Sequence, residues 1–422
     1  MKVRERTVCH TCRDRKLGCD GKLPACSQCL HSDRSCGGYH FIPTQKSTET
    51  RPKSLTASSR ICGAWMEIVP ELTTTGHQGK ALQASIRAFA MAILSQKSSE
   101  ASSIVEALAA HGTALRSVHG AIRNSQMRKP DELSAAIMFL TLSEVLLPCG
   151  SSSESHVAAL VQLMHAQGPS YYSSGTPYGL FIGFRPPIVV WHIWNRKAIF
   201  LGTPDWATIP FQETPADPLQ SLMTIGACIA TMLETMDVLG SSFEPRQALA
   251  CLGSLKDIMA TLDNWKEVYT TSIFQQEDHD LGKSIPMDDI LYHDITEANS
   301  LTHYWAFCII CAVQAQSLQR QLGVARALPL ELAIPESTLQ SNAVSIMRSV
   351  RYLTREEVKL YGAVSLMLPL KVSDEYLERL GGSSFTALRK SATQSIALTG
   401  HHYLNNFVSS DLRILWPMQN VN

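Results

Sequence analysis

Six of the chain's 12 cysteines lie within 28 residues near the start of the sequence, in the run CHTCRDRKLGCDGKLPACSQCLHSDRSC. The run is an internal repeat with a period of 17 residues, since its two halves space three cysteines identically. These are Cys9, Cys12 and Cys19, followed by Cys26, Cys29 and Cys36. A Cys-x2-Cys pair lets two thiolates converge on one cation, which is the usual spacing of zinc ligands. The repeat therefore predicts a metal site.

The number of thiols points to two ions that share ligands. Two separate tetrahedral sites need eight thiolates, whereas the run offers six and the next cysteine is Cys62. Two zinc ions are each four-coordinate when two cysteines bridge both metals, while a single four-cysteine site leaves two cysteines unused. We therefore interpret the run as a cluster that binds two zinc ions.

A small disulfide scaffold is the alternative explanation of the six cysteines. It requires an oxidising compartment. The sequence begins MKVRERTVCH, which is charged and lacks the apolar segment of a signal peptide. We therefore expect an intracellular protein with reduced thiols, which favours zinc over disulfides.

A basic segment lies between the second and third cysteines. Residues 13–18 read RDRKLG and hold three cations and one anion, whereas residues 30–35 in the second half hold one of each. We expect a short helix that starts near Cys12, ends at Gly18 and places Arg13, Arg15 and Lys16 around its open side. Such a helix suits a groove lined with phosphates. A solvated surface turn is the alternative.

The run resembles the DNA-binding module of the fungal binuclear zinc-cluster transcription factors, which carry two zinc ions on six cysteines. The resemblance rests on the six spacings, the basic residues after the second cysteine, Cys19-Asp20-Gly21, and Pro24. It implies that two cysteines bridge the metals and that two further pairs each complete one ion. By this resemblance the bridging residues are Cys9 and Cys26, and the completing pairs are Cys12 with Cys19 and Cys29 with Cys36.

The same resemblance implies a mode of DNA recognition. Family members read CGG-type triplets in the major groove of double-stranded DNA with the end of the first helix, and the base-contacting lysine falls on Lys16. Arg13, Arg15 and Lys22 would then hold phosphates. The position before the third cysteine is often basic in the family but is Gly18 here, so affinity would lean more on those three cations.

Charge is spread unevenly along this neutral chain. Residues 1–40 hold eight Lys/Arg and four Asp/Glu, residues 41–60 hold four and one, and the remainder holds 25 and 32. This distribution predicts that only the N-terminal part binds nucleic acid. Six thiolates and two zinc ions contribute about −2, which weakens the field of the module, so a homodimer would bind DNA more tightly.

These expectations place the protein in the nucleus, where it would also contact the transcription machinery. No apolar run approaches the roughly 20 residues of a membrane span. The longest candidate, YWAFCIICAV at residues 304–313, is half that length. We therefore expect no membrane partner.

The chain divides into three parts by pattern. Residues 1–40 form the zinc-cluster module, residues 41–77 a linker that is largely disordered, and residues 78–422 a large all-α regulatory domain. Apolar periodicity predicts helices at 80–96, 131–147 and 154–167, the last ending at Gly168-Pro169. Further helices are expected near residues 187–202, 217–240, 246–262, 288–322, 337–351, 355–369 and 384–407. No sustained heptad pattern of a coiled coil occurs.

The helical part resembles, more loosely, the fungal-specific transcription factor domain that accompanies such clusters. The similar residues lie in the middle of the chain: His156, Gly168-Pro169, Phe181, Arg185, Phe200, Leu201, Pro204, Trp206 and Pro210. The resemblance implies regulation, dimer contacts and in some members effector sensing, without assigning a ligand.

Other candidate sites carry less weight. Cys308 and Cys311, with His303 nearby, lie in an apolar stretch where cysteine packs as a small hydrophobe. The sequence GKS at residues 282–284 lacks the upstream glycine of a phosphate loop, and Trp191 with Trp194 fits a core face.

We predict a transcription regulator that is not an enzyme, because neither His-Glu-x-x-His nor Gly-x-Ser-x-Gly occurs. It would act on genes of RNA polymerase II, possible targets being a metabolic or secondary-metabolite gene cluster. The alternatives are a metabolite-binding protein or enzyme with an appended zinc module, and a corepressor-like protein that holds zinc but rarely touches DNA.

Overall fold

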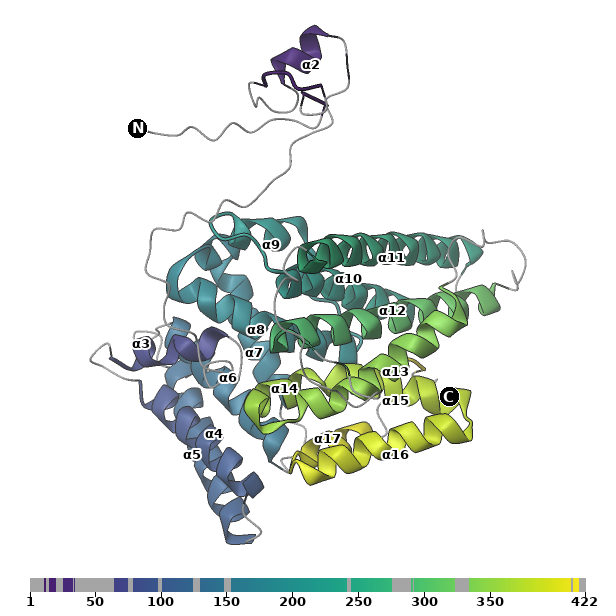
Figure 1. Ribbon diagram of the computed structural model, residues 1–422. Coiled ribbons are helices and arrows are strands. Elements are labelled where there is room, and N and C mark those ends of the chain that lie inside the picture. The colour runs from purple at the N-terminus through teal and green to yellow at the C-terminus, as the bar shows by residue number, and fades with distance from the viewer. Residues whose placement is uncertain are drawn as a thin grey trace. The chain divides into compact units, whose positions relative to one another are not determined.

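The computed structural model describes residues 11–12, 15–19, 26–32, 34, 64–74, 79–97, 101–123, 130–147, 153–240, 244–274, 290, 292–322, 334–410 and 413–416. The chain separates into two compact units, residues 1–55 and residues 56–422. The described residues of both units form helices and no strands, which confirms the predicted all-α class (Figure 1).

The N-terminal unit contains the short helix α2 (Ser27–His31). The helical body begins with η2 (Ala64–Glu67), α3 (Val69–Thr74), α4 (Lys80–Lys97), α5 (Ala101–Arg123), α6 (Pro130–Leu146), α7 (Ser153–Gln167), η4 (Pro169–Tyr172) and α8 (Gly175–Trp194). It continues with η5 (Phe200–Gly202), α9 (Pro204–Thr208), η6 (Ile209–Phe211), α10 (Pro218–Leu239), α11 (Pro245–Phe274), α12 (Ile295–Gln321) and α13 (Glu336–Leu353). It ends with η8 (Glu356–Val358), α14 (Lys359–Ser365), α15 (Met367–Leu380), α16 (Ser383–Leu398) and α17 (His402–Val408).

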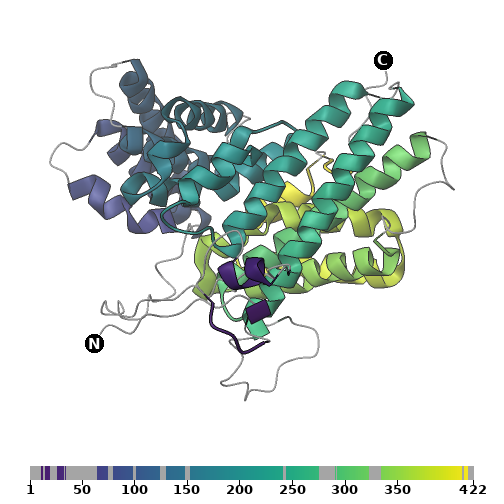
Figure 2. The ribbon, with the colours of Figure 1, turned by 90° about the horizontal axis from the view of Figure 1, so that it is seen from above.

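Helices α4 to α7 gather on one side of the body, and the C-terminal helices pack on the other (Figure 2). Between them, α10 contacts α8, α11 and α12, so the middle of the chain supplies the central core. Gly226 on α10 lies where the three helices are close together: a Cβ there would lie 2.8 Å from Phe307 of α12 and 2.9 Å from Val189 of α8. The three helices therefore pack closely because this position carries no side chain.

Most predicted helices are confirmed, but their ends differ. The predicted helix at 384–407 is two helices, α16 and α17, which are separated at Gly400, where φ is +78°. The predicted helix at 288–322 begins only at Ile295, capped by the Asp294 side chain. Helix α5 was not predicted at all. Its buried positions include alanines such as Ala107 and Ala114, which give a weak periodic signal.

Helix α8 shows why one predicted start was wrong. We expected a helix near residues 187–202, although proline inside a helix usually disrupts it. The helix instead spans Gly175–Trp194 and contains Pro186 and Pro187. Pro186 lacks the N–H that would bond to the carbonyl of Ile182, and the Gln220 side chain donates to that oxygen at 2.8 Å. A neighbouring helix thus supplies the missing donor.

The predicted linker at 41–77 is too long. Residues 64–74 form η2 and α3, and Trp65 is 1% exposed. Its ring contacts Phe139 of α6 and Phe184 of α8, with centroids 4.8 and 5.1 Å away. One buried tryptophan joins this short segment to the helical body, although the segment has no helical periodicity that would reveal it. Residues 41–60 lie outside the described part.

Helix α10 is also long and apolar enough to cross a membrane, contrary to our reading of the sequence. Leu222, Met223 and Ala227 on this helix are fully buried among its neighbours. The apolar composition of α10 is therefore explained by its packing within the helical body.

We predict that Gly226→Ala destabilises the body by about 1–3 kcal/mol, because the added methyl overpacks the contact among α8, α10 and α12. Gly253→Ala on α11 is the matched control, since a Cβ there meets nothing within 4 Å. It should stabilise by up to about 1 kcal/mol through helix propensity. Urea unfolding followed by circular dichroism measures both, and equal changes in the two variants would contradict the proposed packing.

Candidate metal centre and nucleic-acid interface

Three cysteines of the N-terminal run converge in the structure. The Sγ atoms of Cys12, Cys26 and Cys29 all lie within 4.8 Å of one another, and the three side chains are buried. Cys12 Sγ lies 3.6 Å from Cys26 Sγ and 3.9 Å from Cys29 Sγ. Zinc bonded tetrahedrally to sulfur at about 2.3 Å places neighbouring sulfurs about 3.8 Å apart. These separations fit shared metal ligation and exceed the roughly 2.05 Å of a disulfide bond.

Local structure explains part of this convergence. Cys26 is the N-cap of α2, and its Sγ accepts a hydrogen bond from the backbone N–H of Cys29 at 3.3 Å. The Cys-x2-Cys spacing thus folds into the first turn of a helix and directs both sulfurs to one side. Cys19 is partly buried and packs against the three-cysteine cluster. Cys9 and Cys36 lie outside the described residues, so the division of ligands between two ions stays a prediction.

The sequence repeat is also a structural repeat. The backbone N–H of Leu17 donates to the carbonyl of Cys12 at 2.9 Å, and that of Arg34 donates to Cys29 at 3.1 Å. Donor and acceptor are each displaced by 17 residues between the two bonds. A bond over five residues is the closing bond of a helix that ends in a Schellman turn. Both halves therefore carry a hydrogen bond of the same span directly after a metal-ligand cysteine.

The first of these turns ends earlier than the sequence indicated. We expected the helix to stop at Gly18, but the left-handed residue of the turn is Lys16, with φ of +53°. Glycine usually occupies such a position, because a side chain there costs roughly 1–2 kcal/mol. Arg15 and Lys16 are both exposed at this turn. Arg13 and Lys22, the other two predicted DNA contacts, lie outside the described residues.

The second Cys-x2-Cys pair is part of the helical core, as expected. Cys308 and Cys311 on α12 are 3% and 0% exposed. Burial raises the pKa of the Cys308 thiol to about 12 and that of Cys311 further, so both stay protonated. Burial lowers the pKa of His303 to about 4, and its Nδ1 is hydrogen-bonded to the Asn299 carbonyl at 2.8 Å. A neutral imidazole and two thiols in an apolar core serve packing.

Two polar arrangements in the body were missed by sequence reasoning. Glu144 on α6 lies 3.3 Å from His111 Nε2 on α5 and 3.0 Å from His156 Nδ1 on α7, and the three side chains are largely buried. The guanidinium of Arg185 is buried beneath Phe211, 5.3 Å from the ring centroid, and donates to Thr224 Oγ1 at 2.7 Å. Both clusters join residues far apart in sequence.

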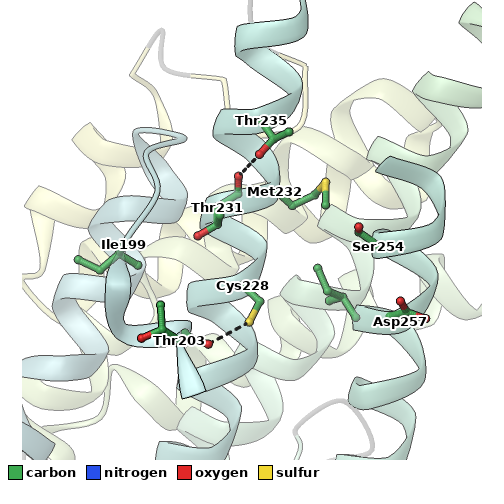
Figure 3. Close-up of a pocket in the computed structure, with 10 residues that line it drawn as sticks. Ile199, Thr203, Cys228, Thr231, Met232, Thr235, Ser254 and Asp257 are labelled. Carbon is green, nitrogen blue, oxygen red and sulfur yellow. Dashed lines mark hydrogen bonds between the residues drawn. The ribbon is translucent and has the colours of Figure 1, made fainter. Parts of the chain in front are cut away.

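A pocket of about 340 Å³ lies between η5, α10 and α11 (Figure 3). Several of its polar groups already have partners. The hydroxyls of Thr231 and Thr235 donate to helix carbonyls at 3.1 and 2.8 Å, and the Cys228 thiol donates to the Gly202 carbonyl at 3.8 Å. These three donors are therefore bonded to backbone carbonyls of the protein itself.

Comparison with known proteins agrees with the geometry of the cysteine cluster. Residues 7–46 match the family described as the fungal Zn(2)-Cys(6) binuclear cluster domain. This match confirms the predicted module with two zinc ions as cofactors on six cysteines, and the converging sulfurs of Cys12, Cys26 and Cys29 fit zinc ligation. The match does not extend into the helical body, whose resemblance to the fungal-specific transcription factor domain stays a prediction.

Three curated proteins are similar over short stretches. An uncharacterized transcriptional regulatory protein of Schizosaccharomyces pombe is 39% identical over 56 residues, 13% of this chain and 10% of its own length. A transcription activator of Alternaria alternata is 56% identical over 34 residues, 8% of this chain and 4% of its own. White-opaque regulator 2 of Candida albicans is 49% identical over 42 residues, 10% of this chain and 9% of its own. The chain thus spans a tenth or less of these relatives, and no solved structure matches it.

We predict that Cys26→Ser reduces bound zinc below two equivalents per chain, because a serine hydroxyl is a poor ligand where a thiolate is needed. Elemental analysis of purified protein measures this. The control is Cys251→Ser, a buried cysteine of α11 in the helical body, which should leave the zinc content unchanged. Two equivalents of zinc in the Cys26 variant would contradict the assignment.

We predict a pH-dependent loss of stability from His303. Its ordinary pKa is about 6.5, so below that pH the unfolded chain binds a proton that the folded chain excludes until about pH 4. The free energy of unfolding therefore falls as pH drops from 6.5 to 4, by about 3 kcal/mol in total.

Denaturant unfolding at pH 7 and pH 5, followed by far-ultraviolet circular dichroism, tests the contribution of His303. His303→Gln should show a smaller loss between these pH values than the wild type, while the exposed His119→Gln control should match the wild type. An unchanged loss in His303→Gln would contradict the prediction.

Proposed function

We propose that this protein is a nuclear, sequence-specific DNA-binding regulator of transcription. The observation that carries the proposal is the placement of two exposed cations, Arg15 and Lys16, at the turn that leaves the first half of the cysteine cluster. The match of residues 7–46 to a binuclear zinc-cluster domain supports it, as do the three similar proteins, whose names describe regulators or an activator of transcription.

The zinc ions would supply the fold of the module rather than chemistry, because so short a segment cannot bury enough apolar surface by itself. The chain's own residues would then do the recognition. Lys16 and the neighbouring backbone would contact base edges of a CGG-type triplet in the major groove, at about 1–3 kcal/mol of discrimination for each good base contact. Arg13, Arg15 and Lys22 would hold phosphates and set the register.

The left-handed backbone of Lys16 supports its separate role. Lys16 lies in a turn, and its positive φ directs its side chain at a different angle from that of Arg15. A lysine kept at a strained position that favours glycine is expected where the side chain itself is needed. The fold of the module alone does not require a cation there.

We propose a homodimer as the DNA-bound form, since the cluster's negative charge weakens the field of one module. The helical body would provide contacts with the transcription machinery and control over its target genes, for which we propose a metabolic or secondary-metabolite gene cluster.

An enzyme or metabolite-binding protein with an appended zinc module is the second candidate. The pocket between α10 and α11 is the feature that favours it, with Asp257 at its wall. The hydroxyls of Thr231 and Thr235 are already bonded to helix carbonyls, however, so these two groups are engaged within their own helix instead of orienting a substrate. We therefore prefer the regulator.

Binding titrations with duplexes that carry a CGG triplet or a scrambled triplet test the proposal. Lys16→Ala should lose about 1–3 kcal/mol of discrimination between the two duplexes, because it removes a base contact. Arg13→Ala should weaken binding to both equally and lower the salt slope by about 1, because it removes a phosphate contact.

Two results would contradict the base-contact role. One is an equal effect of Lys16→Ala on the matched and scrambled duplexes. The other is wild-type protein that binds both duplexes with one affinity, which would refute sequence-specific recognition altogether.

A further inference from the structure

Residues 413–416, which read Arg-Ile-Leu-Trp, are held in the helical body by side chains. The two central residues, Ile414 and Leu415, are 0% and 1% exposed. Their backbone N–H groups both donate to the carboxylate of Glu375 on α15, at 3.0 to 3.1 Å. The segment belongs to no helix, and these two residues lie in a bend of the chain.

The carbonyls of the same two residues are also bound by side chains. Arg196, which follows α8, donates to the Ile414 carbonyl at 3.1 Å, and Gln314 of α12 donates to the Leu415 carbonyl at 2.9 Å. All four backbone groups of this dipeptide therefore have partners on three different parts of the body. Arg196, Gln314 and Glu375 are themselves 7%, 3% and 2% exposed.

The surrounding groups hold these three side chains in place. Arg196 forms an ion pair with Asp237, at 2.7 Å from Nη2 to the carboxylate, and its own φ is +51°. Lys371 lies 3.9 Å from Glu375 and donates to the carbonyls of Val408 and Ser410 at 2.8 Å. The site therefore combines charged groups that a purely apolar contact would not require.

Further contacts recognise the side chains at the two ends of the segment. Arg379 places its guanidinium carbon 4.5 Å from the centre of the Trp416 ring. Arg413 pairs with Glu378 at 2.9 Å, where both side chains are exposed to solvent. Ile414 and Leu415 themselves join the main apolar core. The bound pattern is thus a basic residue, two branched apolar residues and an aromatic residue.

The hydrogen bonds that hold Ile414 and Leu415 differ from those of the helices. They run to side chains, so removal of the segment leaves the backbone ladders of α8, α12 and α15 complete. What removal exposes is a set of ordered polar groups around an apolar surface, which is the composition of a peptide-binding site.

We propose that Arg196, Gln314 and Glu375 form a peptide-binding site, that residues 413–416 occupy it within the same chain, and that a partner protein displaces them with a bent segment of the same pattern. These three side chains would bind the peptide backbone by hydrogen bonds. The peptide sequence would be selected by the burial of two consecutive apolar residues and by the contact of Arg379 with the aromatic ring that follows them. Displacement exchanges one set of contacts for an equivalent set.

The test uses the full chain, folded before it is cut. A cleavage sequence for a specific protease is inserted between Ser410 and Arg413, and the purified protein is cleaved and separated from the released fragment. A fluorescent peptide of residues 411–418 should then bind saturably with a micromolar dissociation constant. Uncleaved protein should bind it at least tenfold more weakly, because its own segment competes.

Changes in the peptide distinguish specific recognition from nonspecific hydrophobic binding while the protein stays the same. N-methylation of the Leu415 nitrogen removes one donor to Glu375 and should weaken binding at least tenfold. Arg413→Ala in the peptide removes only the exposed ion pair and should change affinity less than threefold. A scrambled peptide should not bind.

A random peptide library selected on the cleaved protein identifies the partner pattern. We expect enrichment of two consecutive branched apolar residues followed by an aromatic residue. The proposal is overturned if the body loses its helical signal when the fragment leaves, if the N-methylated or scrambled peptide binds as well as the original, or if selection returns unrelated sequences.

Discussion

The N-terminal module depends on the convergence of thiolates around metal. Cys12, Cys26 and Cys29 bring three sulfurs within 4.8 Å of one another in a unit that has no other buried cluster among its described residues. Without a cation, three thiolates so close would repel, and three thiols would leave the module with little to hold it together. The turn that holds Arg15 and Lys16 depends on this convergence, because the backbone N–H of Leu17 is hydrogen-bonded to the carbonyl of Cys12.

The helical body is stabilised differently from the N-terminal module, because its long helices pack around an apolar core. Gly226 permits close approach at its centre, and Gln220 compensates for a proline inside α8. Buried charged groups among its described residues have partners elsewhere in the chain, as Glu144 on α6 has in His111 on α5 and His156 on α7. The two units have separate cores, one formed by metal-binding cysteines and one by apolar side chains, so each can unfold without the other.

Sequence reasoning succeeded where the signal is local. The cysteine spacing predicted the metal centre, and the 3.6-residue periodicity predicted α4, α6, α7 and α10 close to their observed bounds. It failed where the cause lies far along the chain. Trp65 joins the body through rings 74 and 119 residues away, and Ile414 is bound by Arg196 over 218 residues. The end of the first turn was misplaced because glycine is the statistical choice for a left-handed residue, whereas the chain places Lys16 there.

The backbone at Lys16 limits which residues that site can accept during evolution or engineering. Asparagine and aspartate tolerate this conformation, but branched residues such as valine or isoleucine meet steric conflict with the preceding carbonyl. In the proposed mode of DNA recognition, only a few residue types could therefore replace Lys16 and change the DNA preference. Under the same proposal, half-site spacing and flanking cations are free of this backbone constraint, so target sites should diverge through them more readily than through the triplet.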